Sequence, residues 1–191
     1  MEHICQLNDQ TKQYLERFYS ILDEMICNMT KAELTQSISH NFIVQMIPHH
    51  RAAIEMSQNI LHYTTCQPLR RIASHIISSQ TKSIEDMEKL LPSCSQLCNP
   101  QRDLQLYQRR TDLILRTMFS EMGSAPETND IDADFLREMI PHHQGAIGMS
   151  RNALHYDLCP GLIPPIRAII TSQRRGVREM EALLRCIACP Q

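Results

Sequence analysis

The chain has 191 residues and a mass of 22.1 kDa, with 42% apolar residues and a formal charge of −2. The near balance of charge gives no electrostatic reason to expect nucleic acid, and no window approaches the roughly 18 uninterrupted apolar residues of a membrane span. Only two valines and five glycines are present, too few for a many-stranded sheet with its turns. The composition predicts an all-α protein.

The first twenty residues do not resemble a secretory signal. Glu2, Asp9, Lys12, Glu16 and Arg17 interrupt any apolar core there. As written, the chain is expected to be cytoplasmic.

Apolar residues recur at helical spacing in six segments. The predicted helices run from about Asn8 to Met29, Ser39 to Leu61, Leu69 to Leu91, Arg102 to Met122, Ile131 to Ala153 and Pro164 to Leu184. Connections of roughly five to ten residues, marked by prolines and glycines, require neighbouring helices to alternate in direction. In the second helix, His49 and His50 lie on the apolar arc, whereas Gln45 and Asn59 lie opposite.

The chain repeats itself without gaps at an offset of 93 residues. The segment from Met46 to Cys66 matches the segment from Met139 to Cys159. Every methionine after Met1 has a counterpart at this offset, although many neighbouring positions differ. We interpret residues 1–191 as one helical domain of two repeats, at about 8–98 and 101–191, each with three helices. Because the helices alternate, the second and third helices of repeat two should run antiparallel to those of repeat one.

Each repeat carries Met-x-x-His-His, at Met46 to His50 and at Met139 to His143. On a helix, this spacing puts thioether and imidazole on adjacent turns. Thioether favours soft ions such as Cu(I) or Ag(I). Met56 lies seven residues beyond His49, about 10 Å along a helix, so it belongs to a second site or pairs with another helix.

Polar residues on apolar faces add to this pattern. Gln80 and Gln173 fall on the otherwise apolar faces of the third helices, and a buried amide needs partners. We expect both amides to hydrogen-bond the histidines as an outer shell that orients the imidazoles. Pro48 and Pro141 each remove a helical hydrogen bond beside the histidines.

These residues resemble the domain of unknown function 305 family, whose members carry two copies of Phe-x3-Met-Ile-x-His-His-x2-Ala-x2-Met, each followed by a helix with Gln and Met seven apart. Here the blocks are Phe42 to Met56 and Phe135 to Met149. The resemblance covers both repeats. It implies a ferritin-like four-helix core from the second and third helices of each repeat, with an additional helix before each pair. Some members bind copper, and members are commonly exported.

The predicted site combines the repeated sulfur and nitrogen donors, and copper, as Cu(I), is the expected cofactor and partner. The proposed ligands are Met46, His49, His50, Met56, Met139, His142, His143 and Met149, with Met87 and Met180 reaching in from the third helices. We expect sequestration or delivery of the ion. The alternative is a metal-free structural or interaction bundle, including a homo-oligomer, in which methionine fills the core and the histidines form a hydrogen-bonded network. His62 and His155 are expected at helix ends, and His3, His40 and His75 on the surface.

No enzyme signature is present. The Glu-x-x-His pairs of di-iron bundles do not occur, nor does a phosphate-binding glycine loop or a Gly-x-Ser-x-Gly nucleophile motif. We therefore expect no catalytic activity.

Eight cysteines form a second hypothesis. Alternating helices would bring four to each end of the bundle: Cys27, Cys94, Cys98 and Cys159 at one end, and Cys5, Cys66, Cys186 and Cys189 at the other. Each end could hold disulfides or a thiolate site for zinc, or the cysteines could simply pack as small apolar residues.

Overall fold

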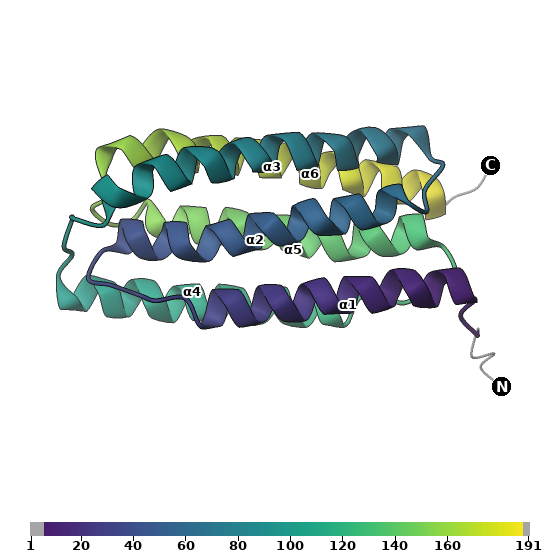
Figure 1. The fold of residues 1–191 in the computed structure, drawn as a ribbon, viewed down its shortest axis with the longest axis horizontal. Helices are drawn as coiled ribbons and strands as arrows, with labels where there is room; N and C mark the ends of the chain where they lie inside the picture. Colours follow the sequence, from purple (N-terminus) through teal and green to yellow (C-terminus); the bar gives the residue numbers. More distant parts are fainter. Residues whose placement is uncertain (1–5, 189–191) are drawn as a thin grey trace.

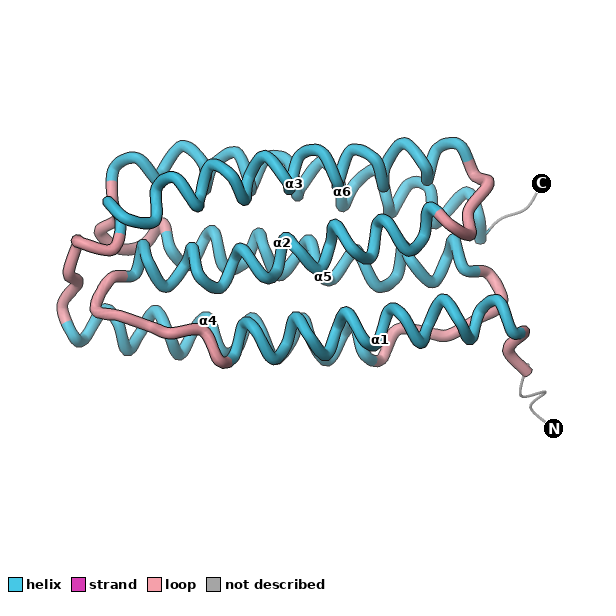
Figure 2. Tube along the Cα trace, viewed as in Figure 1, coloured by secondary structure: helices cyan, strands magenta, loops and turns pink. Residues whose placement is uncertain are grey.

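The computed structural model describes residues 6–188, which form six α-helices in three layers and no strand. Figure 1 shows α3 (Gln67–Cys94) beside α6 (Ile163–Ala188) in one outer layer, and α1 (Asp9–Thr30) with α4 (Gln101–Gly123) in the other. The middle layer contains α2 (Ile38–Leu61) and α5 (Ile131–Ala153). A short 3₁₀ turn, η1 (Pro160–Leu162), precedes α6. The tube in Figure 2 shows that the loops lie toward the two ends of the bundle, where the connections to α2 and α5 run partly along the outer layer of α1 and α4.

Successive helices alternate in direction, as predicted from the short connections. Figure 1 shows α2 antiparallel to α5, and α3 antiparallel to α6. Each repeat packs α2 or α5 against the helices before and after it, and the two repeats meet chiefly through α2 and α5. The all-helical prediction is confirmed, and the midpoints of the two middle helices lie at the centre of the molecule.

Polar side chains cap the first turn of α1, α2 and α5. Asn8 accepts from the Thr11 amide at 2.8 Å, Ser37 from the His40 amide at 3.2 Å, and Asp130 from the Ala133 amide at 3.1 Å. These caps satisfy amides that have no partner inside a helix. Both α2 and α5 continue through their internal prolines, and α3 continues through Pro92, so its end lies beyond the predicted Leu91.

The middle layer buries both of its faces. Gln45 and Asn59, which we placed on a polar face, are buried, because α1 covers one side of α2 and α3 covers the other. Asn59 donates to the Tyr14 carbonyl at 3.1 Å, and Asn152 donates to the Tyr107 carbonyl at 3.0 Å at the corresponding place in repeat two. These polar residues therefore join layers and do not face solvent.

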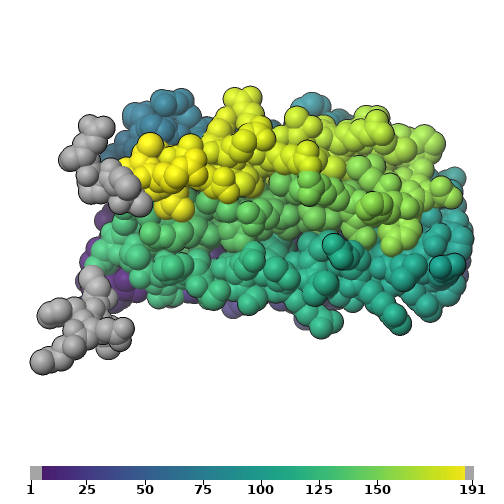
Figure 3. Space-filling model, turned by 180° about the vertical axis from the view of Figure 1, so that it is seen from behind, coloured from purple at the N-terminus to yellow at the C-terminus, as the bar shows by residue number. Residues whose placement is uncertain are grey.

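Asn99 connects the repeats at one end of the bundle. Its backbone N–H donates to the Gln36 carbonyl, and its side-chain oxygen accepts from the Ile38 backbone N–H. Its side-chain nitrogen donates to the Asp157 carbonyl, and each of the three bonds is 2.8 Å long. Space-filling atoms cover the layers continuously in the view of Figure 3. None of the helices described has the length and apolarity needed to cross a bilayer.

Candidate soft-metal site

Four imidazoles form a row across the centre of the bundle. His49 and His50 lie on α2, His142 and His143 lie on α5, and none exposes more than 3% of its surface. The ring centroids of His49 and His142 are 3.7 Å apart. The centroids of His49 and His50 are 5.9 Å apart, and those of His142 and His143 are 6.0 Å apart. The row thus runs His50, His49, His142, His143, with the contact between α2 and α5 at its middle.

Burial keeps these rings uncharged. It lowers the pKa of His50 to about 3 and the pKa of His142 to about 4, and the neighbouring His142 adds to the shift at His50. The pKa values of His49 and His143 are also well below the ordinary value, first because of burial and then because of the other histidines. At pH 7 all four rings are neutral, which is the state in which an imidazole nitrogen can bind a metal.

The two central histidines hold each other through the backbone. Nε2 of His49 is 3.1 Å from the carbonyl oxygen of His142, and Nε2 of His142 is 3.1 Å from the carbonyl oxygen of His49. A carbonyl oxygen only accepts, so in each neutral ring Nε2 carries the hydrogen and Nδ1 keeps its lone pair. Nδ1 is buried and has no hydrogen-bond partner within residues 6–188 in any of the four histidines. The fold therefore leaves lone pairs on the central rings without partners.

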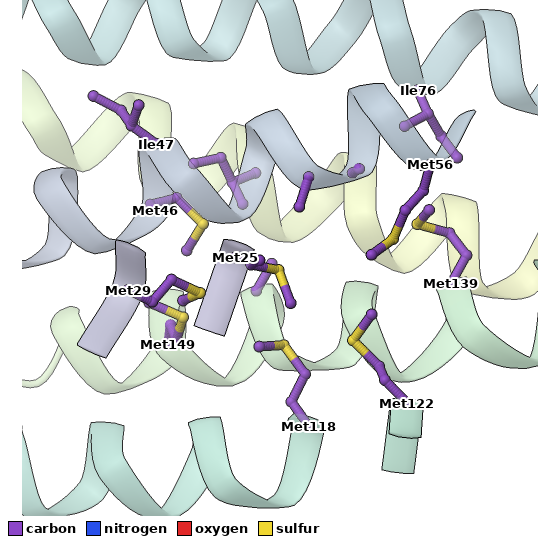
Figure 4. Close-up of a cluster of buried hydrophobic side chains, with 14 of the residues drawn as sticks. Met25, Met29, Met46, Ile47, Met56, Ile76, Met118, Met122, Met139 and Met149 are labelled. Atoms are coloured by element: carbon purple, nitrogen blue, oxygen red, sulfur yellow. The ribbon is translucent and has the colours of Figure 1, made fainter. Parts of the chain in front are cut away.

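The methionines surround the contact between the layers. All ten methionines that follow Met1 are buried. Figure 4 shows Met46 gathered with Met149, and Met56 pointing toward Met139, so each pair joins α2 to α5. One outer-layer methionine is drawn beside each pair: Met29 of α1 beside Met46 and Met149, and Met122 of α4 beside Met56 and Met139. Because α2 and α5 are antiparallel, the two methionines of one repeat go to different groups.

This arrangement divides the predicted ligands. Among the residues described, no group of three or more His, Cys, Asp or Glu side chains is placed to hold a metal ion, and the imidazoles form a row instead of a cluster. A soft ion would have to combine one or two imidazoles with methionine sulfur. Met87 and Met180 are fully buried on α3 and α6. They lie two helical turns beyond Gln80 and Gln173, about 10 Å along the axis.

The predicted hydrogen bonds from Gln80 and Gln173 to the histidines do not form. Both amide atoms of Gln80 and Oε1 of Gln173 are buried without a partner in the described part of the chain. Both side chains instead line a cavity between α3 and α6, together with His50. The two glutamines thus approach the histidine row, but the space between them and the rings is not closed.

The cysteine hypothesis separates into two outcomes. Cys94 at the end of α3 forms a disulfide with Cys159, just before η1, and this bond joins the two repeats. Cys27 and Cys98, expected at the same end, are free thiols. At the other end Cys66 and Cys186 are free as well, while Cys5 and Cys189 lie outside the described residues. No thiolate metal cluster is present among residues 6–188.

The remaining histidines lie away from the row. His62 caps the end of α2 and His155 follows the end of α5, both exposed, and His75 is exposed on α3. His40, expected on the surface, is half-buried, with Nδ1 2.8 Å from Ser95 Oγ and Nε2 3.1 Å from the Glu33 carbonyl. His3 lies outside the described residues.

One buried pair was missed by the sequence reasoning. Tyr14 on α1 donates its hydroxyl to Glu138 Oε2 on α5 at 2.5 Å, which links the two repeats. Burial raises the pKa of Glu138 well above its ordinary value, although the hydrogen bond from Tyr14 opposes this. The signal in the sequence was the comparison of the two repeats, because Glu138 is a carboxylate at the position where repeat one has the neutral Gln45.

A protein-family model matches most of this chain. The model called domain of unknown function (DUF305) matches residues 22–91 and 39–184, which together include both Met-x-x-His-His segments. The chain belongs to the DUF305 family. No curated protein matches this DUF305 chain.

Three solved structures resemble this DUF305 protein, each at 24% sequence identity. A DUF305 fragment from Deinococcus radiodurans has a TM-score of 0.55 and covers 77% of this chain and 95% of its own. CopM in its Ag-bound form, obtained by soaking, has a TM-score of 0.59, with 79% and 97% covered. CopM in its Cu(II)-bound form has a TM-score of 0.57, with 77% and 95% covered. At this identity the likeness shows the fold.

Proposed function

We propose that this DUF305 protein binds a soft metal ion, Cu(I), for sequestration or delivery. The observation that carries the proposal is the unpartnered Nδ1 lone pair of His49 and of His142, held buried by Nε2–H bonds to opposite carbonyls. A buried acceptor without a partner is costly, and a metal ion would use that lone pair directly.

The surrounding donors support a soft ion in particular. Thioether sulfur is a weak hydrogen-bond acceptor but a good ligand for Cu(I). Met46 and Met139 lie three residues before His49 and His142, one turn away on the same arc. The buried methionine groups come from both repeats, so each ion could be held by donors of α2 and α5. The metal-bound states of CopM, a protein of similar fold, support the same choice.

The rival function is a metal-free structural bundle, and one observation favours it. The reciprocal hydrogen bonds between His49 and His142 satisfy one nitrogen of each ring without any metal. On this reading the stacked rings hold the two repeats together, and methionine fills the core around them.

Anaerobic titration with Cu(I) separates the two functions. The free thiols are first alkylated, because thiolates would bind the ion themselves, and the Cys94–Cys159 disulfide is kept. We expect competition with a chromophoric chelator to give tight, stoichiometric binding. The paired variant His49→Gln/His142→Gln should lose at least tenfold in affinity, and the exposed-site control His75→Gln should match the wild type. Folded protein that binds no Cu(I), or binds it equally in the paired variant, contradicts the proposal.

A further inference from the structure

A cavity of about 230 Å³ opens between α3 and α6 and reaches one end of the histidine row. His50 is one of its lining residues, and serines of both α3 and α6 also line it. Lys82 and Asp86 line it too and pair with each other at 3.1 Å, so this pair leaves no net charge. Such a volume admits several waters, and therefore a small ion.

At the other end of the row, the α6 backbone lies close to the His143 ring. At Gly176 on α6, a side-chain carbon would meet the His143 ring at 2.9 Å from Cδ2 and 3.0 Å from Nε2. The helix backbone thus lies directly against this ring. At the corresponding place in repeat one is Ser83, which lines the cavity over His50. Both rings are almost fully buried, at 1% and 3% exposed, but His50 lines this cavity, whereas the α6 backbone at Gly176 lies against the His143 ring.

Small residues on α6 keep the cavity open. Pro165 and Ala168 line it, and their counterparts in repeat one are the larger Ile72 and His75. Ile72 and His75 line a different groove, farther along the same helix pair, together with Cys186. The two repeats have therefore diverged at the positions that line these two openings between α3 and α6.

The cavity wall also holds polar atoms without partners. Gln80 and Gln173 are each 2% exposed and line the cavity. The oxygen of each amide and the nitrogen of Gln80 make no hydrogen bond within residues 6–188. Buried polar atoms without a hydrogen-bond partner are rare in native proteins, and a bound ligand is one way in which they are satisfied. Two amide oxygens beside an imidazole can replace part of the hydration shell of a cation as it leaves water.

We propose that the α3–α6 cavity is the port through which the soft ion enters and leaves, with His50 as the first donor it meets. The ion then passes along the row to His49 and His142 and the methionines beside them. This inference rests on the proposed function, but it concerns the route and not the affinity. A port of this kind controls the rates of loading and unloading equally, because the same passage is used in both directions.

A rival route exists on the opposite side of the middle layer. A groove of about 480 Å³ is lined by α1, α2 and the last part of α3. Met25 and Glu24 are among its lining residues, so it also offers sulfur and a negative charge to a cation. The experiment must therefore obstruct each route separately.

The test uses Ala168→Trp, which places a large ring at the exposed mouth of the cavity. Asn28→Trp obstructs the rival groove, and Ala182→Trp, on α6 but in the groove near Cys186, is the matched control. Thiol-alkylated protein is loaded with Cu(I) and mixed with excess bicinchoninate, and the coloured complex reports the rate of release. Chelator competition gives the dissociation constant separately, and circular dichroism confirms folding.

We expect Ala168→Trp to slow release at least tenfold with a dissociation constant within twofold of the wild type. Asn28→Trp and Ala182→Trp should change neither quantity more than twofold. Ala168→Leu, which is smaller, should slow release to an intermediate degree and replaces the Trp variant if that one is unfolded. Unchanged release in both Ala168 variants, or slowing by Asn28→Trp instead, overturns the port. Absence of Cu(I) binding in the wild type overturns the proposed function and the port together.

Discussion

Acid should unfold the metal-free protein steeply because of the buried histidine row. In the folded state the pKa is about 3 at His50 and about 4 at His142, and it is well below the ordinary value at His49 and His143. An unfolded histidine titrates near 6.5. Below pH 6.5 the unfolded chain binds more protons than the native one, so stability falls as pH falls. The loss continues until the pH reaches the folded-state pKa values.

The slope can be worked from the number of groups. Four rings that each bind about 0.9 more protons when unfolded at pH 5 give roughly 5 kcal/mol per pH unit. Glu138 acts oppositely, because its pKa is raised in the folded state, so protonation there favours the native protein as pH falls. Subtracting about 1 kcal/mol for this carboxyl leaves a slope of roughly 4 kcal/mol per pH unit near pH 5. Since domains are stable by about 5–15 kcal/mol in total, unfolding should be complete near pH 4.

Urea unfolding followed by circular dichroism between pH 4.5 and 7.5 measures this slope. The paired variant His49→Gln/His142→Gln should reduce this slope by roughly 2.5 kcal/mol per pH unit, because it removes two rings that each bind about 0.9 more protons when unfolded. This expectation holds whatever the effect of the variant on stability at pH 7. His75→Gln, on the surface, should leave it unchanged. A slope below about 1 kcal/mol per pH unit, or one that the paired variant does not alter, refutes the neutral buried row.

Two further predictions concern the disulfide and the helix packing that stabilise the bundle around the histidine row. Removing the disulfide in Cys94→Ser/Cys159→Ser opens a loop with a sequence separation of 65, which should lower the free energy of unfolding by about 4 kcal/mol on a chain-entropy estimate. Equal urea midpoints for the two proteins contradict this. Gly145→Ala drives a methyl group into the Met118 side chain and should cost about 1–3 kcal/mol by overpacking. Gly123→Ala meets no atom within 4 Å, so thermal unfolding should show no loss there, and equal losses at both glycines exclude packing as the cause.

Much of the helical architecture could be predicted from periodicity and proline placement. The helices lie within a few residues of their predicted bounds, and the antiparallel order of the middle helices follows from connection length alone. Which face of α2 is buried could not be found in this way. One polar arc looks solvent-facing in a single helix, but a helix between two layers is buried on both sides, as Gln45 shows.

The geometry of the candidate site depends on contacts between the two repeats, and the spacing of residues along one helix does not predict such contacts. Met-x-x-His-His indicates that sulfur and imidazole share an arc, yet Met46 gathers with Met149 because of the antiparallel crossing. Backbone acceptors were equally invisible: the partner of the His49 ring is the carbonyl of His142, and any residue there would offer one. The opening over His50 depended on Ala168 and Ser83, small residues that carry no motif.

The central claim, that Nδ1 of His49 and of His142 is a free donor for a soft ion, is tested most directly by nitrogen NMR. Long-range proton–nitrogen spectra of the thiol-alkylated protein report which ring nitrogen carries the hydrogen, before and after addition of Ag(I), a diamagnetic soft ion. The account predicts Nε2–H tautomers in the metal-free protein and displaced Nδ1 resonances, with Nε2–H retained, once Ag(I) is bound. Nδ1–H tautomers without metal, or Nδ1 resonances that Ag(I) leaves unmoved, would contradict it.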